Sequence, residues 1–278
     1  MTSFFNSPTK LKYDVPPDAV AVLVVIHGMA EYSARYTPAI EWLNAQGIGC
    51  CTYDQRGHGA APASERERGD VAAFQDLVSD AAATIDSVRV KCSPLPVFVW
   101  GHSMGAIVAT LAAAHGVNPG QIKARGFITS SPPIAAFDRL PTFVVSMLKW
   151  VALVAPRLRV PLPFKPEFLS RDLQVGLRYA ADPLVPKTVT LRLLVQLADA
   201  STRCVQVARK VKGPWLALHG TDDEIAPPIG SQRLIDGLAS TDKYLRVWPQ
   251  ARHEVHNEIE PTRTEFLECM AAWIKERT

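Results

Sequence analysis

The chain lacks the features that mark secreted and membrane-spanning proteins. Its 278 residues include five cysteines, an odd number without a C-x-x-C pair, so we expect reduced thiols in a cytoplasmic protein. No apolar run approaches the roughly 20 residues that span a bilayer. The N-terminus shows no charged segment followed by an apolar one, so we expect no signal peptide.

Charge and motif content exclude other classes. A net charge of +3 is too small to indicate nucleic acid as a partner. The sequence contains no internal repeat, no Walker motif, no dinucleotide-binding glycine pattern and no metal-ligand spacing, so we expect no cofactor and no metal. What is present is a chain with 47% hydrophobic residues, which is long enough to bury a large core.

Strand-like and helix-like segments alternate along the chain. Strands are expected at 19–26, 48–53, 97–100, 126–130, 215–218 and 245–248, and helices at 35–45, 71–90, 105–114, 190–210, 229–239 and 260–275. Such alternation predicts a mostly parallel central sheet flanked by helices on both faces.

Prolines interrupt this alternation between residues 132 and 188, where nine of them occur. Because proline stops regular structure, we predict short helices and turns here. The chain is therefore divided into a core domain of residues 1–131 and 189–278 and a cap of residues 132–188.

The motif GHSMG at residues 101–105 follows a strand and precedes a helix. That order is typical of a nucleophile elbow, in which Ser103 stands exposed on a tight turn at the sheet edge. The competing interpretation is an ordinary glycine-rich turn between a strand and a helix. The backbone N–H groups of Met29 and Met104 are the candidates for binding the oxyanion, because one follows the first long strand and the other follows the serine.

A nucleophilic serine needs a base, and the base needs an acid to orient it. In this fold both follow the serine along the chain, at the ends of later strands. Asp223 is the candidate acid, with Asp222 as the alternative. His253 is the candidate base, with His256 as the alternative. The remaining histidines near turns are expected to be structural, namely His27, His58 and His219.

Five segments carry a resemblance to a known family. They read HGMAEYSARY at 27–36, YDQRGHG at 53–59, GHSMG at 101–105, GTDD at 220–223 and RHEVHNE at 252–258. They are similar to conserved motifs of the monoacylglycerol lipase and lysophospholipase branch of the α/β-hydrolases, grouped with the S33-type serine aminopeptidases. The resemblance runs from about residue 20 to the C-terminus, and it carries the acid onto Asp223 and the base onto His253. It departs at the N-terminus, where only residues 10–15 are strand-like and the family usually has two strands.

The resemblance implies an α/β-hydrolase fold with a helical cap inserted after the sixth strand. It also implies a serine hydrolase that cleaves carboxylic esters with an apolar acyl chain, of monoacylglycerol lipase or lysophospholipase type, and needs no cofactor. The alternatives are a broad carboxylesterase for short esters, an amidase or peptidase of the same fold, and a non-catalytic binding protein. The expected partner is a small lipid or ester, and the sequence leaves the oligomeric state open.

The cap contains an apolar segment at 143–155 that is too short to span a membrane. We expect it to cover the serine and to line an acyl-chain tunnel through Phe143, Met147, Leu148 and Val151; simple packing on the core domain is the alternative. Residues 138–192 carry nine basic side chains, Arg139 among them, against four acidic ones. An apolar helix beside a basic rim predicts transient contact with an anionic lipid surface, and a solvated basic face is the alternative.

Overall fold

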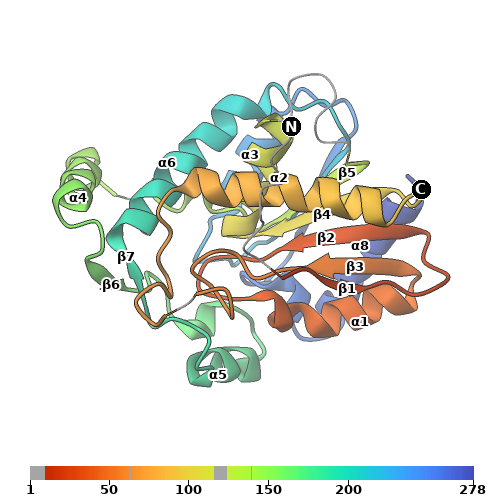
Figure 1. Ribbon diagram of the computed structural model, residues 1–278, viewed down its shortest axis with the longest axis horizontal. Coiled ribbons are helices and arrows are strands. Elements are labelled where there is room, and N and C mark those ends of the chain that lie inside the picture. Colours follow the sequence, from red (N-terminus) through yellow and green to blue (C-terminus); the bar gives the residue numbers. More distant parts are fainter. Residues whose placement is uncertain (1–9, 63, 116–123, 139) are drawn as a thin grey trace, which may run out of the picture.

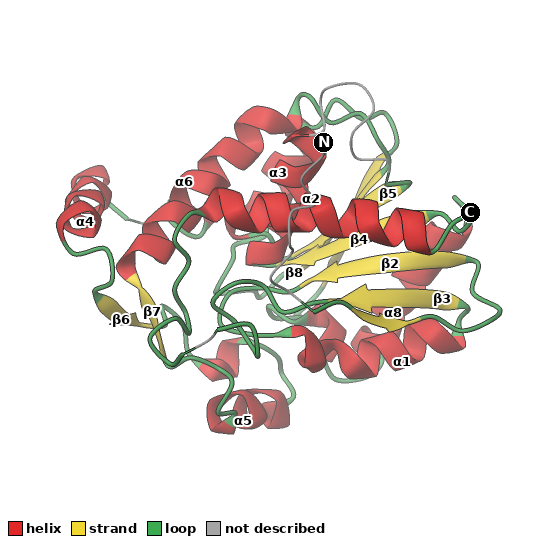
Figure 2. Cartoon of the chain, viewed as in Figure 1, coloured by secondary structure: helices red, strands yellow, loops and turns green. Residues whose placement is uncertain are grey.

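The computed structural model describes residues 10–62, 64–115, 124–138 and 140–278. A seven-stranded sheet lies between two layers of helices (Figures 1 and 2). Its strands follow the spatial order β1-β3-β2-β4-β5-β8-β9, and all pairs are parallel except β1 with β3. The strands are β1 (Lys12–Asp14), β2 (Ala21–Ile26), β3 (Ile48–Thr52), β4 (Val97–His102), β5 (Gly126–Ser130), β8 (Trp215–Gly220) and β9 (Lys243–Trp248). The expected mostly parallel sheet is confirmed.

Alternate side chains of the strands pack against opposite helix layers. In β2, Val22 and Val24 belong to one buried cluster, whereas Leu23 and Val25 belong to the other. The first cluster is completed by α2 (Phe74–Lys91), α3 (Met104–His115), α6 (Leu191–Ala208) and α7 (Ile229–Gly237), and the second by α1 (Thr37–Ala45) and α8 (Thr262–Lys275). Continuous apolar strands are therefore explained by burial on both faces.

The cap departs from expectation in its position and in one element. Within the described chain a single short strand, β1, precedes β2, so the cap follows the fifth strand and not the sixth. The cap also contains an antiparallel ribbon of β6 (Arg159–Pro161) and β7 (Thr188–Thr190), where helices and turns alone were expected. Pro161, which has no N–H to donate, is tolerated because it lies at the end of the ribbon. The boundary drawn between 188 and 189 falls inside β7.

The rest of the cap consists of η2 (Pro133–Ala135), α4 (Thr142–Val154), η3 (Pro166–Phe168) and α5 (Leu173–Ala181). One part of it is tied to the core by side-chain contacts, such as the ion pair of Arg171 with Glu258 at 2.9 Å and the hydrogen bond that the Tyr32 hydroxyl donates to Asp182 at 2.7 Å. In contrast, α4 stands out at one end of the molecule (Figure 1), and none of its thirteen residues, all of them described, is buried. Across the described residues, every helix is too short or too polar to cross a membrane.

Candidate active site

Ser103 sits on the turn between β4 and α3, with a φ of 52°. A Cβ added to Gly105 would lie 2.0 Å from the Ile26 carbonyl oxygen, and one added to Gly101 would lie 2.3 Å from the Gly105 carbonyl oxygen. Both positions therefore require glycine. A non-glycine residue at positive φ is strained, and such strain is typical of a nucleophile elbow.

Asp223 and His253 are brought together from two neighbouring strand ends. The Nδ1 atom of His253 lies 2.8 Å from Oδ2 of Asp223. The other carboxylate oxygen accepts hydrogen bonds from two backbone N–H groups of the following turn, at 2.8 and 2.9 Å. Asp222, in contrast, is exposed and its carboxylate accepts from the hydroxyl of the adjacent Thr221. Of the two candidate aspartates, the geometry favours Asp223.

The electrostatics of this pair suit a base and its acid. Burial by itself lowers the pKa of His253, but the Asp223 carboxylate, helped by Glu254 and Glu31, holds that pKa above its ordinary value of 6.5. Burial would raise the pKa of Asp223, yet the imidazoles of His253 and His219 keep it well below its ordinary range. Asp223 is therefore ionised, and it stabilises the protonated form of His253.

His219 makes a contact that the sequence analysis missed. Its Nε2 atom lies 3.0 Å from Oδ2 of Asp223, so two imidazoles share one carboxylate oxygen. From its place beside a glycine turn, His219 is expected to be a structural residue. The available signal was the spacing of four residues between His219 and Asp223 across a strand-end turn.

The other histidines lie apart from the candidate acid. His256 is buried and stacks on Tyr36 with ring centroids 5.0 Å apart, and in the described chain neither of its ring nitrogens has a hydrogen-bond partner. His102 packs against the His253 ring at 4.9 Å, and its Nδ1 lies 3.0 Å from the hydroxyl of Ser130. The geometry therefore favours His253 over His256 as the base.

The candidate oxyanion donors come from two chain segments, one after β2 and one at the start of α3. In the described part of the chain, the N–H groups of Met29 and Met104 make no hydrogen bond. Met104 begins α3, where the helix dipole favours negative charge. The loop that carries Met29 is held by Glu31, whose carboxylate accepts from the N–H of Gly28 and, at 2.8 Å, from the hydroxyl of Tyr36. Met29 lines the cavity described below, whereas Met104 is fully buried, and the role of both N–H groups stays a prediction.

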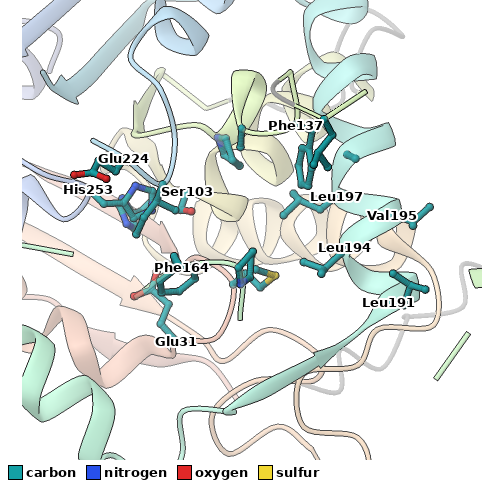
Figure 3. A pocket seen from close by; sticks show the side chains of 18 of the residues that line it. Glu31, Ser103, Phe137, Phe164, Leu191, Leu194, Val195, Leu197, Glu224 and His253 are labelled. Carbon is teal, nitrogen blue, oxygen red and sulfur yellow. The ribbon is translucent and has the colours of Figure 1, made fainter. Parts of the chain in front are cut away.

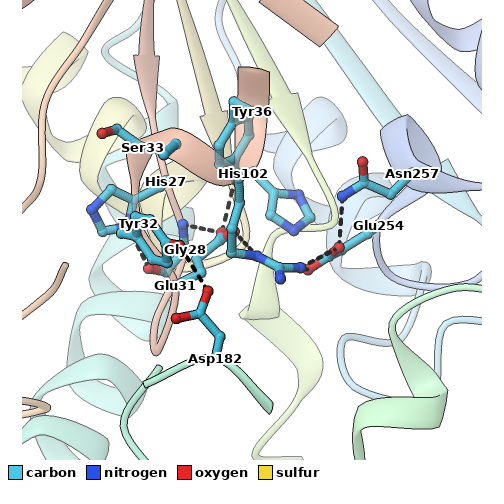
Figure 4. A network of polar contacts seen from close by, with 12 residues as sticks. His27, Gly28, Glu31, Tyr32, Ser33, Tyr36, His102, Asp182, Glu254 and Asn257 are labelled. Carbon is cyan, nitrogen blue, oxygen red and sulfur yellow. Dashed lines mark hydrogen bonds and ion pairs between the residues drawn. The ribbon is translucent and has the colours of Figure 1, made fainter. Parts of the chain in front are cut away.

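A buried polar network surrounds this loop (Figure 4). The Nη2 atom of Arg35 lies 2.7 Å from both carboxylate oxygens of Glu254, and the Nε atom of Arg35 lies 3.6 Å from Glu31. Asn257 donates to Glu254 at 2.8 Å. Burial and the neighbouring Glu254 raise the pKa of Glu31 to about 7. The network joins the loop of Met29 to the loop of His253.

A cavity of about 460 Å³ opens beside Ser103 (Figure 3). Polar side chains gather at the end near the serine, among them His253, Glu31 and Glu224. The far end is apolar and is formed by η2, the chain after it and α6, with Phe137, Leu191, Leu194, Val195 and Leu197. The site can therefore hold a molecule that is polar at the serine and apolar along its length.

Only one of the four cap residues expected to line this cavity does so. Leu148 lines it together with Val145 and Lys149, at the spacing of one helix face. Phe143 and Met147 lie on the outer face of α4, with 72% and 54% of their surface exposed, so the expectation for these two is wrong. Val151 is half-buried and does not line the cavity. The helix was predicted correctly, but the face that it turns inward was not.

An elbow serine, a carboxylate–histidine pair and a mostly parallel sheet define an α/β-hydrolase. The sequence matches the family described as serine aminopeptidase, S33, over residues 17–260. It is 31% identical to the monoacylglycerol lipase of Mycolicibacterium smegmatis, over 95% of this chain and 92% of that one, and 31% identical to the monoglyceride lipase of Homo sapiens, over 93% and 83%.

A solved structure supports the same family assignment. The crystal structure of Paleococcus ferrophilus monoacylglycerol lipase superposes with a TM-score of 0.83 at 30% identity, covering 97% of this chain and 99% of that one. The chain therefore belongs to the S33 family of α/β-hydrolases, in the branch that contains the monoacylglycerol lipases, and it is a carboxylic ester hydrolase.

Proposed function

We propose that the protein hydrolyses monoacylglycerols, with Ser103 as the nucleophile, His253 as the general base and Asp223 as the acid that orients it. The observation that carries this proposal is the cavity of about 460 Å³, which is apolar along its length and polar where it meets Ser103. An acyl chain fits the apolar part, and its ester carbonyl then lies beside the serine.

The proposed reaction is acyl transfer in two steps. The Nδ1 atom of His253 is engaged by Asp223, which leaves Nε2 to take the hydroxyl proton as Ser103 attacks the ester carbonyl. The N–H groups of Met29 and Met104 stabilise the oxyanion. His253 then protonates the leaving alcohol, and the ester bond breaks. Water, deprotonated by His253, attacks the acyl-enzyme, and the proton returns to Ser103 as the fatty acid leaves.

Charge at the polar end favours a neutral head group. Three carboxylates line the cavity there, from Glu31, Glu224 and Glu254, whereas Lys149 pairs with Asp199 at 2.6 Å. Glu254 is paired with Arg35, and the pKa of Glu31 is about 7. Repulsion of a lysophospholipid phosphate therefore comes mainly from Glu224, while the carboxyl oxygens can accept hydrogen bonds from the hydroxyl groups of glycerol. A monoacylglycerol is therefore preferred over a lysophospholipid with the same acyl chain.

Hydrolysis of p-nitrophenyl esters with two to sixteen carbons tests the reaction and the acyl preference. We expect maximal kcat/KM at eight carbons or more, and a loss of about 10⁶ in kcat for Ser103→Ala. A maximum at two to four carbons would favour the short-chain carboxylesterase. Activity that survives in Ser103→Ala would refute the mechanism.

Head-group preference is tested with substrates that share one acyl chain and differ in the head group. We expect faster hydrolysis of 1-oleoylglycerol than of oleoyl lysophosphatidic acid, and no release of p-nitroaniline from aminoacyl anilides. The opposite order would favour the lysophospholipase, and anilide cleavage would favour the peptidase. Failure to react with a fluorophosphonate would indicate a binding protein without catalysis.

We also propose that the enzyme touches membranes through the outer face of α4. Phe143, Trp150 and Leu153 are 72%, 65% and 81% exposed there. Arg157 and Lys165 lie 3.6 and 3.7 Å from the carboxylates of Asp70 and Glu167, yet they keep 75% and 71% of their side-chain surface exposed. Arg139 lies outside the described residues. An apolar face with nearby exposed cations fits an anionic lipid surface.

Sedimentation with vesicles tests this contact. We expect more binding to vesicles that contain phosphatidylserine than to pure phosphatidylcholine, and less binding for Trp150→Glu. Tyr244→Glu, on the edge strand β9 of the core, is the matched control, because it introduces the same charge at an aromatic side chain that is 58% exposed. Equal binding to both vesicle types would remove the electrostatic part of the proposal, and unchanged binding of Trp150→Glu would remove the contact through α4.

A further inference from the structure

We infer that His219 is a positioning residue: the N–H of its ring, which the hydroxyl of Ser231 holds from the other side, fixes the Asp223 carboxylate that orients His253. The inference rests on the proposed function, because it adds a residue to the same site. His219 lies at the end of β8 and Ser231 lies in the first turn of α7, and neither side chain lines the cavity.

The Asp223 carboxylate is held by four donors. Its Oδ2 lies 2.8 Å from His253 Nδ1 and 3.0 Å from His219 Nε2, while its Oδ1 accepts from the N–H groups of Ile225 and Ala226 at 2.9 and 2.8 Å. Asp223 and the two histidines are each at most 5% exposed. Water therefore cannot easily replace a lost donor, and the loss of one would leave a buried lone pair unsatisfied.

The contacts of His219 define its tautomer. Its Nε2 atom faces two oxygens, Oδ2 of Asp223 and, at 2.7 Å, the carbonyl oxygen of Ala226. Neither oxygen can donate, so Nε2 carries the hydrogen. In the neutral ring Nδ1 is then an acceptor, and the fully buried hydroxyl of Ser231, 2.7 Å away, donates to it. The two acceptor oxygens on Nε2 thus select the tautomer that points an N–H at Asp223, and Ser231 satisfies the opposite nitrogen and holds the ring in place.

The His219 imidazole has two effects on the pair formed by Asp223 and His253. It restrains rotation of the carboxylate, so that Oδ2 stays in line with His253 Nδ1. It also takes up part of the carboxylate charge, which lowers the basicity of Asp223 and limits how far Asp223 raises the pKa of His253. Without His219, Asp223 would hold the proton on His253 more tightly and with less defined geometry.

Other charged and titratable groups also face His253. Glu254 on its own loop and Glu31 from the loop after β2 both raise its pKa. His102 at the end of β4 packs against its ring at 4.9 Å, and His256 on η4 (Val255–Asn257) lies against His102 at the same separation. These groups are unchanged in the variants below, so a difference in titration reports on His219.

The test uses NMR titration of the histidines in the Ser103→Ala background, so the result does not depend on catalysis. Labelling by a fluorophosphonate, with Ser103 intact, measures the reactivity of the serine. The variants are His219→Phe, His219→Gln, whose amide N–H can still donate to Asp223, and Ser231→Ala. The matched control is His58→Phe, because His58 is equally buried and bonds within its own turn, 2.8 Å from the Arg56 carbonyl oxygen.

We expect His219→Phe to raise the pKa of His253 and to slow labelling by as much as about 100-fold, and His219→Gln to restore both. Ser231→Ala should change the pKa of His253 and the labelling rate in the same directions, but by less. His58→Phe should lower Tm and leave the pKa of His253 and the labelling rate unchanged. An unchanged His253 titration in His219→Phe overturns the inference. If that variant does not fold, an unchanged titration in Ser231→Ala overturns it. Failure of the proposed function appears separately, as hydrolysis that survives Ser103→Ala.

Discussion

Arg35 and Glu254 form a buried ion pair in which Nη2 of the arginine lies 2.7 Å from both carboxylate oxygens. Their side chains are 10% and 2% exposed. Arg35 follows the loop that carries the candidate oxyanion donor Met29, and Glu254 follows the candidate base His253. One ion pair therefore holds together two loops that are more than 200 residues apart in sequence.

Removal of the arginine charge should destabilise the fold. In Arg35→Met, Glu254 and Glu31 would remain buried without their shared cation, and breaking a buried pair in this way costs about 3–5 kcal/mol. Urea denaturation measures the loss. The matched control is Arg263→Met, which removes a pair with Glu260 whose two side chains are 44% and 49% exposed, so its cost should be at most about 1 kcal/mol. Equal losses in the two variants would contradict the buried role of Arg35.

The elbow glycine should be equally sensitive. In Gly105→Ala the new Cβ would meet the Ile26 carbonyl oxygen at 2.0 Å, so the backbone of β2 or α3 must shift. We expect a loss of about 3 kcal/mol or more in the free energy of unfolding, together with loss of fluorophosphonate labelling. Gly213→Ala is the control, because nothing lies within 4 Å of the added Cβ and its stability should change by less than about 1 kcal/mol. A stable and reactive Gly105→Ala would show that the elbow is not tightly packed.

Much of the fold and the candidate site was predictable from the sequence, for local reasons. Strands such as β2 are apolar on both faces, and Gly101 is required by a contact within the GHSMG turn itself, although Gly105 is required by the backbone of β2. The pairing of Asp223 with His253 follows from strand order, since the carboxyl ends of parallel strands meet at one edge.

What could not be predicted depends on tertiary contacts. An apolar helix such as α4 has no polar face to show which side turns inward, so Phe143 and Met147 were placed in the cavity when Leu148 alone of the expected residues lies there. The role of His219 was missed because a histidine beside glycine resembles any turn residue until Ser231, twelve residues later, is folded against it.

The pH dependence should report the base. Hydrolysis needs neutral His253, and the carboxylate of Asp223 holds its pKa above 6.5, so kcat/KM should fall with decreasing pH and reach half its maximum above 6.5. In Asp223→Asn the carboxylate is gone, and burial then lowers the pKa of His253. The acid limb of the profile, where kcat/KM falls with decreasing pH, should therefore move to lower pH, and kcat should fall by about 10⁴. Profiles between roughly pH 5 and pH 9 measure both.

Glu31 needs its own control in that experiment, because its pKa of about 7 lies in the same range. In Glu31→Gln the acid limb should persist and move slightly to lower pH, since one negative charge near His253 is lost. If the limb disappears in Glu31→Gln, the titrating group is Glu31 and the assignment of the limb to His253 is wrong.

The inward face of α4 is tested by two neighbouring residues. Leu148 lines the cavity, whereas Met147 is 54% exposed on the outer face. A tryptophan at 148 would fill part of the apolar end, so Leu148→Trp should reduce kcat/KM for twelve-carbon esters relative to four-carbon esters by about 10-fold or more. Met147→Trp adds a similar volume outside the cavity and should leave this ratio unchanged. Equal ratios in both variants and the parent would show that the acyl chain does not reach α4, and a loss confined to Met147→Trp would show that the helix turns its other face inward when substrate binds.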